Sequence, residues 1–224
     1  MAYYNENRGS FWTHIPVATR NLLLVNVVVY IFTFIADMRG SDVMLEYFAA
    51  FFPTSPFFQF WQPLTYMFLH ANFAHLFFNM WALFLFGTAL ERAIGVKKFL
   101  ILYFACGLGA WLMHTGVQWA QYEFFVSAGL EQNAFNILRT PTLGASGAIY
   151  GIEVAFAVVY PNLMLTQIFP PISLKAKWMI LIFIGIEILT GITGTMDGVA
   201  HFAHLGGALI GFLLMLFWKK SAQW

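Results

Sequence analysis

The chain has 224 residues, of which 60% are hydrophobic, 19% are aromatic and only 9% are charged, and its formal net charge is +1. This composition excludes a soluble globular protein, because too few polar side chains remain to cover a surface in water. It also gives no sign of nucleic-acid binding, since basic clusters and basic–aromatic patterns are both missing from the sequence.

Apolar stretches recur along the chain, and about 20 apolar residues are enough to cross a bilayer as a helix. The expected fold class is therefore all-α: a polytopic membrane protein with a six-helix bundle over 19–218, a tail over 1–18 and a second tail over 219–224. In chain order, the spans are expected at 19–37, 73–91, 99–120, 145–160, 177–194 and 198–218.

The connections between the spans differ in character. The segment 38–72 is broken by prolines yet rich in aromatic residues, which predicts an element lying in the membrane interface. A polar connection is expected over 121–143, and a long return with Pro170 over 161–176. Gly194 and Asp197 indicate a short turn between the last two spans.

The eleven Lys and Arg residues predict the orientation. If the N-terminus lies in the cytoplasm, only Arg39 and Arg139 fall on the outer side, which is the bias expected of membrane proteins. The other nine then lie on the cytoplasmic side: Arg8, Arg20, Arg92, Lys97, Lys98, Lys175, Lys177, Lys219 and Lys220. Both termini are therefore expected in the cytoplasm, and in a bacterium the membrane would be the plasma (inner) membrane.

With this orientation, the second, fourth and sixth spans all begin at the outer side, and polar residues mark each beginning. His75 and Asn79 share one helix face because they are four residues apart. Ser146 opens the fourth span and His204 lies in the first turns of the sixth. Unpaired polar groups in a bilayer cost several kcal/mol, so these side chains are expected to gather around a hydrated pocket that opens outwards.

The residue types favour acyl transfer. Pro141 and Gly144 keep the helix from starting before Ser146, so the backbone N–H of this serine should lack a partner within its helix. Serine becomes a nucleophile when a base takes its proton, and histidine suits that role near neutral pH. No intramembrane Asp is expected near the base, and Glu153 and Glu187 are expected well below the serine, so a Ser–His dyad fits better than a triad.

Three motifs together carry a family resemblance: His-x4-His-x3-Asn from His70 to Asn79, Gly-x-Ser-Gly from Gly144 to Gly147, and Ala-His-x2-Gly from Ala203 to Gly207. In this order, on these spans, they resemble the rhomboid family of intramembrane serine proteases, and the resemblance covers essentially the whole chain. It implies a membrane-embedded first loop over 38–72, substrates that are transmembrane segments of other proteins within the lipid bilayer, and a reaction that needs no metal and no cofactor.

The resemblance also implies roles for single residues. Ser146 would be the nucleophile and His204 the general base, while His75, Asn79 and the Ser146 N–H would support the oxyanion. Tyr150 would pack against the catalytic imidazole, and Gly207 would let the sixth span press against Gly147.

Several alternatives stay open. His201 is three residues from His204 and could meet Ser146 instead, His70 could orient the site or be structural, and Glu153 and Glu187 could relay protons or take part in packing. The histidines could instead bind a metal or haem, although His-Glu-x-x-His is absent. The polar cavity could also belong to a transporter or to a catalytically inactive membrane-protein binder.

Overall fold

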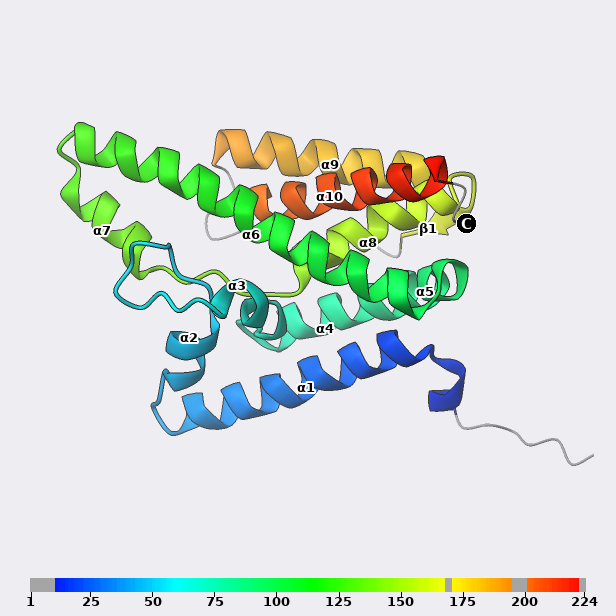
Figure 1. Ribbon diagram of the computed structural model, residues 1–224, viewed down its shortest axis with the longest axis horizontal. Helices are drawn as coiled ribbons and strands as arrows, with labels where there is room; N and C mark the ends of the chain where they lie inside the picture. Colours follow the sequence, from blue (N-terminus) through cyan, green and yellow to red (C-terminus); the bar gives the residue numbers. More distant parts are fainter. Residues whose placement is uncertain (1–10, 168–170, 195–200, 222–224) are drawn as a thin grey trace, which may run out of the picture.

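The computed structural model describes residues 11–167, 171–194 and 201–221 (Figure 1). Within these ranges, five helices are long and apolar enough to cross a membrane: α1 (Val17–Met38), the combined helix Phe73–Ile94, α6 (Val96–Ser127), α9 (Ala176–Thr193) and α10 (His201–Lys220). The combined helix consists of α4 (Phe73–Ala82), the π-helical turn η3 (Leu83–Gly87) and α5 (Thr88–Ile94). Five of the six predicted spans therefore have the length that a crossing needs.

The remaining apolar helix, α8 (Ser146–Val159), has only 14 residues. It starts part-way along the bundle, enclosed by α4, α6, α9 and α10, and most of its residues are buried (Figure 1). At about 1.5 Å per residue, such a helix is about 21 Å long, which is shorter than the hydrocarbon core of a bilayer. The count of six spans consequently stays a prediction.

Small residues bring α10 close to α8 and α6. A Cβ atom added at Gly207 would meet the carbonyl oxygen of Gly147 at 1.8 Å, and one added at Gly206 would meet that of Gly109 at 2.5 Å. Glycine is therefore required at both crossings, as is common where membrane helices touch. These contacts fix the position of the first turns of α10 relative to the start of α8.

The loop before α8 is held by the segment 38–72. This segment is not one helix but contains α2 (Val43–Phe48), α3 (Gln62–Thr65) and the 3-10 helix η2 (Tyr66–Phe68). Ala50 pairs with Thr142 in an isolated β-bridge, and the Gly144 N–H donates to the Tyr66 carbonyl at 2.9 Å. Gly144 has φ = 127°, which favours glycine, so the turn that presents Ser146 depends on this residue.

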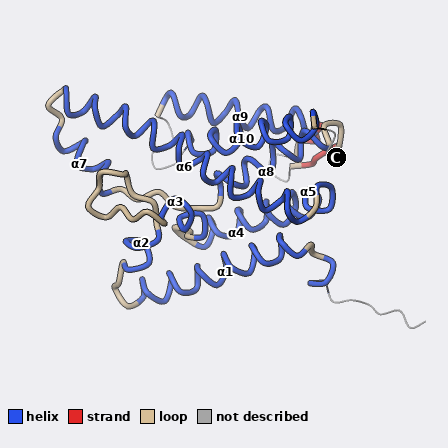
Figure 2. The backbone as a smooth tube through the Cα atoms, viewed as in Figure 1, coloured by secondary structure: helices blue, strands red, loops and turns tan. Residues whose placement is uncertain are grey.

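Several connections differ from the expectation. The connection 121–143 is largely helical: α6 continues to Ser127 and α7 (Glu131–Arg139) follows. The return to the fifth span contains an antiparallel hairpin of β1 (Met164–Thr166) and β2 (Ser173–Lys175), the red strands in Figure 2. Strands of three residues are too short to show an apolar periodicity from which they could be predicted. The elements η1 (Phe11–His14) and α1 replace most of the described part of the predicted N-terminal tail.

Some expectations lie outside the described residues. These are Arg8 and residues 1–10 of the N-terminal tail, Pro170, Asp197 and residues 222–224 of the C-terminal tail.

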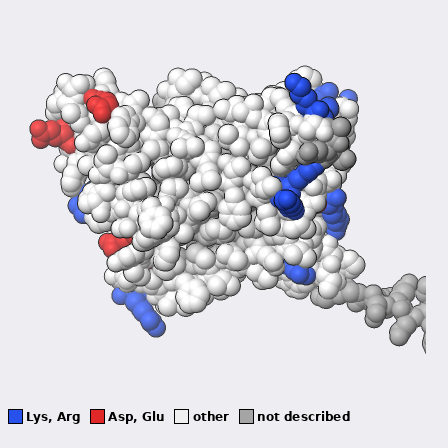
Figure 3. All heavy atoms as spheres, viewed as in Figure 1, with Lys and Arg blue, Asp and Glu red and all other residues white. Residues whose placement is uncertain are grey.

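Charged side chains separate towards the two ends of the bundle. α1, α6 and α9 run in one direction, and α4, α8 and α10 run in the other (Figure 1). Most of the Lys and Arg side chains visible in Figure 3 gather at the end where α6 and α9 begin and α10 ends. The visible acidic side chains lie towards the opposite end, mainly near the tip formed by α6 and α7.

Candidate active site

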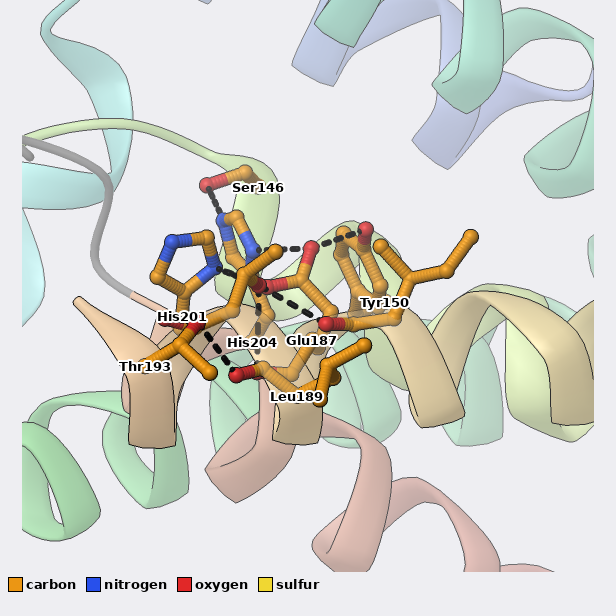
Figure 4. A network of polar contacts seen from close by, with 9 residues as sticks. Ser146, Tyr150, Glu187, Leu189, Thr193, His201 and His204 are labelled. Atoms are coloured by element: carbon orange, nitrogen blue, oxygen red, sulfur yellow. Dashed lines mark hydrogen bonds and ion pairs between the residues drawn. The ribbon is translucent and has the colours of Figure 1, made fainter. Parts of the chain in front are cut away.

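The first residue of α8 faces the second turn of α10. The hydroxyl of Ser146 lies 2.8 Å from Nε2 of His204, although 58 residues separate the two in sequence (Figure 4). The His204 side chain is 12% exposed, so this contact is largely shielded. The structure therefore brings together the two residues on which the predicted chemistry depends.

The His204 imidazole is also held by a second residue of α8 and by a residue of α9. Tyr150 of α8 stacks on the ring, with centroids 4.4 Å apart and planes 5° apart. Glu187 of α9 places Oε1 3.0 Å from His204 Nδ1. The expectation that Glu187 lies well below the serine is wrong, because its carboxylate reaches the same imidazole that Ser146 contacts. The sequence does carry a signal for a role of Glu187, because ionisable residues within a membrane span are usually functional.

His201 does not take the place of His204. Its Nδ1 lies 2.6 Å from Glu187 Oε2 and 3.1 Å from the Thr190 hydroxyl. Among the hydrogen bonds of the described residues, none joins His201 to Ser146. Of the two candidate bases, the structure therefore pairs His204 with the serine.

His75 of α4 lies close to Ser146. A Cβ atom added at Gly144 would lie 3.0 Å from His75 Nε2 and 3.7 Å from the Ser146 hydroxyl, so the imidazole edge and the serine border one small space. His75 Nδ1 accepts the Ala71 N–H at 3.4 Å. A neutral imidazole with an accepting Nδ1 carries its proton on Nε2, the nitrogen nearer the serine.

Asn79 and His70 stand behind His75. The Asn79 Nδ2 donates to the His75 carbonyl at 2.8 Å, so one of its two amide hydrogens is held by its own helix rather than aimed at Ser146. His70 is 1% exposed and packs edge-on against the His75 ring with centroids 5.0 Å apart. Burial and, to a smaller extent, the nearby His75 lower the pKa of His70 to about 3. The neutral His70 ring thus supports His75 by packing.

A cavity of about 860 Å³ opens beside these residues. Ser146, His75, His201 and His204 line one part of it, and residues of α6, α7, α9 and the loop before α8 also contribute to its walls. Its volume lies in the range of ligand-binding sites. Among the described residues, no group of three or more His, Cys, Asp or Glu side chains is arranged to bind a metal ion.

Comparison with known proteins shows the family of the chain. The family model of the rhomboid domain matches residues 58–221, which is most of the chain. The chain belongs to the rhomboid family. It is 34% identical over 204 residues to the rhomboid protease AarA of Providencia stuartii, across 88% of this chain and 71% of that protein. It is 28% identical over 218 residues to Rhomboid-like protein 11, chloroplastic, of Arabidopsis thaliana, across 95% of this chain and 66% of that protein.

The family assignment agrees with the resemblance inferred from the three motifs. The matched range contains His75, Ser146 and His204, the residues that border the cavity in this rhomboid-family chain. With its apolar helices, the assignment makes the protein an integral membrane protein. Relatives that are named proteases support a serine protease.

Proposed function

We propose that the protein is an intramembrane serine endopeptidase in which Ser146 is the nucleophile and His204 the general base. The observation that carries this proposal is the 2.8 Å contact between the Ser146 hydroxyl and His204 Nε2 at the edge of a large cavity. A nucleophile within hydrogen-bond reach of a base, with the base oriented by further groups, is the arrangement that covalent catalysis requires.

The proposed reaction follows from the positions of the Ser146 hydroxyl and His204 Nε2. The Ser146 oxygen attacks the peptide carbonyl while its proton moves to His204 Nε2. That proton then passes to the leaving amine as the C–N bond breaks, and water releases the acyl group from the serine by the same route in reverse. The proposed reaction steps use no cofactor and no metal ion.

Two donors suit the developing oxyanion. The Ser146 N–H lies in the first turn of α8, where backbone N–H groups lack partners within the helix. His75 Nε2 borders the same small space as the Ser146 hydroxyl, so its N–H can donate to an oxyanion formed there. Asn79 fits less directly, since its amide donates to the His75 carbonyl. We assign Asn79 the role of fixing the first turns of α4 and of offering its second amide hydrogen to the oxyanion.

The substrates we propose are transmembrane segments of other proteins, cut towards the outer end. The cavity is lined by residues at the start of α8 and at the start of the described part of α10, whereas Lys219 and Lys220 lie in the last turn of α10, which supports an outward-facing site and cytoplasmic termini. The substrate must unwind near the cut, so residues with poor helix propensity and a small residue before the cleaved bond favour cleavage. We propose access past α9, and six membrane crossings with α8 as the shortest.

A cleavage assay tests the proposal. Purified protein in detergent is incubated with a tagged membrane protein that has one spanning segment, and mass spectrometry locates the new terminus. We expect Ser146→Ala and His204→Ala to lower the rate by at least about 1,000-fold. Ser127→Ala, the same change at an exposed serine near the end of α6, should cleave at the wild-type rate. Cleavage retained in Ser146→Ala would show that the nucleophile is assigned wrongly, and binding without any cleavage by the wild type would favour an inactive binder.

A further inference from the structure

One carboxylate of α9 connects the two histidines of α10 to the tyrosine of α8. Glu187 Oε1 lies 3.0 Å from His204 Nδ1 and accepts the Tyr150 hydroxyl, while Oε2 lies 2.6 Å from His201 Nδ1 (Figure 4). The Glu187 side chain is 9% exposed. Three polar groups from two neighbouring helices therefore converge on a shielded carboxyl group.

The hydrogen bonds around the cluster fix where the protons lie. The Thr190 hydroxyl donates to the Ile186 carbonyl at 2.7 Å, so it faces His201 Nδ1 with a lone pair. His201 Nδ1 consequently carries a hydrogen, which it shares with Thr190 and Glu187. The Tyr150 hydroxyl donates to Glu187 as well. A carboxyl group that receives donors at both oxygens is best satisfied in its ionised form, because a buried charge needs such partners.

An ionised Glu187 dictates the state of His204. A bare Nδ1 lone pair 3.0 Å from a carboxylate oxygen would be repelled, so Nδ1 carries the hydrogen and donates it. The neutral imidazole then presents the lone pair of Nε2, which is the atom 2.8 Å from the Ser146 hydroxyl.

We propose that Glu187 is a positioning residue that holds His204 in its reactive tautomer and stabilises the imidazolium formed when Nε2 takes the Ser146 proton. This inference rests on the function proposed above. The proton of the serine moves to Nε2, the hydrogen on Nδ1 stays there, and Glu187 only accepts its hydrogen bond. His201 and Tyr150 keep the carboxylate in place. The resulting Ser146–His204–Glu187 series is carried by three helices, in place of the dyad expected from the sequence.

Substitutions of Glu187 can distinguish a role in positioning His204 from a role in packing alone. Glu187→Gln keeps the size and an acceptor oxygen but removes the charge, and Glu187→Asp restores the charge at a shorter reach. Glu153→Gln is the matched control, since it replaces a carboxyl group of α8 by an amide of the same size, and no hydrogen bond among the described residues joins Glu153 to His204. Each variant is assayed for kcat and KM on the transmembrane substrate over a range of pH, and for thermal unfolding in detergent.

We expect Glu187→Gln to lower kcat by about 10- to 100-fold with KM changed less than about twofold, because the lost interaction acts mainly after the proton has moved. The acid limb of the kcat profile should shift to lower pH, since an imidazole without its anion binds a proton less readily. Glu187→Asp should recover part of kcat, and Glu153→Gln should match the wild type.

Other titratable groups near His204 and Glu187 are retained in every Glu187 variant: His75 of α4, His114 of α6, Tyr150 and Glu153 of α8, and His201 of α10.

Each outcome decides the proposal. A Glu187→Gln protein with the wild-type kcat and acid limb would overturn it, as would an equal loss in Glu153→Gln. If the glutamine variant does not fold, ¹⁵N spectra of histidine-labelled unsubstituted protein give the tautomer of His204 directly: a hydrogen on Nδ1 supports the proposal and one on Nε2 overturns it. If Ser146→Ala still cleaves, the proposed function fails. If Ser146→Ala is inactive but Glu187→Gln keeps the wild-type kcat, the Ser146–His204 dyad stands and Glu187 is not part of it.

Discussion

The ring of Tyr150 lies flat on the ring of His204, 4.4 Å between centroids and 5° between planes, while its hydroxyl donates to Glu187. One side chain thus limits the rotation of the imidazole and also holds the carboxylate behind it. The two contributions can be separated by substitution, because the stacking needs only the ring and the hydrogen bond needs only the hydroxyl.

Tyr150→Phe is expected to lower kcat by about twofold to fivefold, since one hydrogen bond contributes about 1 kcal/mol or less. Tyr150→Ala, which also removes the stacked ring, is expected to lower kcat by at least about 10-fold, because the imidazole gains freedom that misaligns Nε2. Steady-state cleavage of the transmembrane substrate measures both. Equal rates for the two variants would mean that stacking does not orient His204.

His75→Ala should lower kcat by about 100- to 1,000-fold, the usual cost of a lost oxyanion donor, with little change in KM. Asn79→Ala should have a smaller effect, because its amide donates to the His75 carbonyl. The ratio of the two kcat values is the measurement. A larger loss for Asn79→Ala would make that amide, rather than the imidazole, the main donor.

The close crossing of α8 and α10 can be tested by stability. Gly207→Ala places a Cβ atom 1.8 Å from the Gly147 carbonyl oxygen, so the helices must move apart, at an expected cost of about 1–3 kcal/mol together with loss of cleavage. Gly116→Ala is the control. Gly116 lies within α6, and a Cβ atom added there would meet nothing within 4 Å, so the substitution should be neutral or slightly stabilising. Unfolding in detergent compares them, and similar midpoints would contradict the packing described.

Glu91 anchors the start of α1 from outside that helix. Its buried carboxylate accepts the Ala18 N–H at 2.9 Å, and the Thr19 N–H and Thr19 hydroxyl at 2.7 Å each. Glu91→Gln is expected to destabilise the protein by about 1–3 kcal/mol, because the helix start loses charge-assisted hydrogen bonds. Glu123→Gln, at an exposed site, should leave the unfolding midpoint unchanged. A midpoint for Glu91→Gln equal to that of this control would exclude the anchoring role.

Much of the bundle could be predicted from sequence because the apolar stretches are long. The start of α4 and its polar residues follow from local pattern, and so does the break that makes Ser146 the first residue of α8. Residues 198–200, where the sixth span is expected to begin, lie outside the described residues. The bounds of α8, Ser146–Val159, lie within one residue of the expected span 145–160, but its depth could not be predicted, since the apolar run before Pro161 does not reveal how deep in the bundle the helix begins.

The depth at which α8 begins explains why Glu187 does not lie well below Ser146. Glu187 lies six residues before Thr193, the last residue of α9, or about 9 Å from that end of the helix. A serine at the outer end of a full-length span would lie above this level. Because α8 begins part-way along the bundle, Ser146 and Glu187 reach the same imidazole. The hairpin β1–β2 and helix α7 also escaped prediction, since each depends on contacts between short segments.

The central claim is that Ser146 is a nucleophile activated by His204, and covalent labelling tests it most directly. The purified protein is treated with a fluorophosphonate, and the modified residue is located by mass spectrometry of its peptides. We predict one adduct, on Ser146, which is absent in Ser146→Ala and forms at least about 100-fold more slowly in His204→Ala. No adduct on the wild-type protein, or an adduct that forms equally fast without His204, would contradict the account.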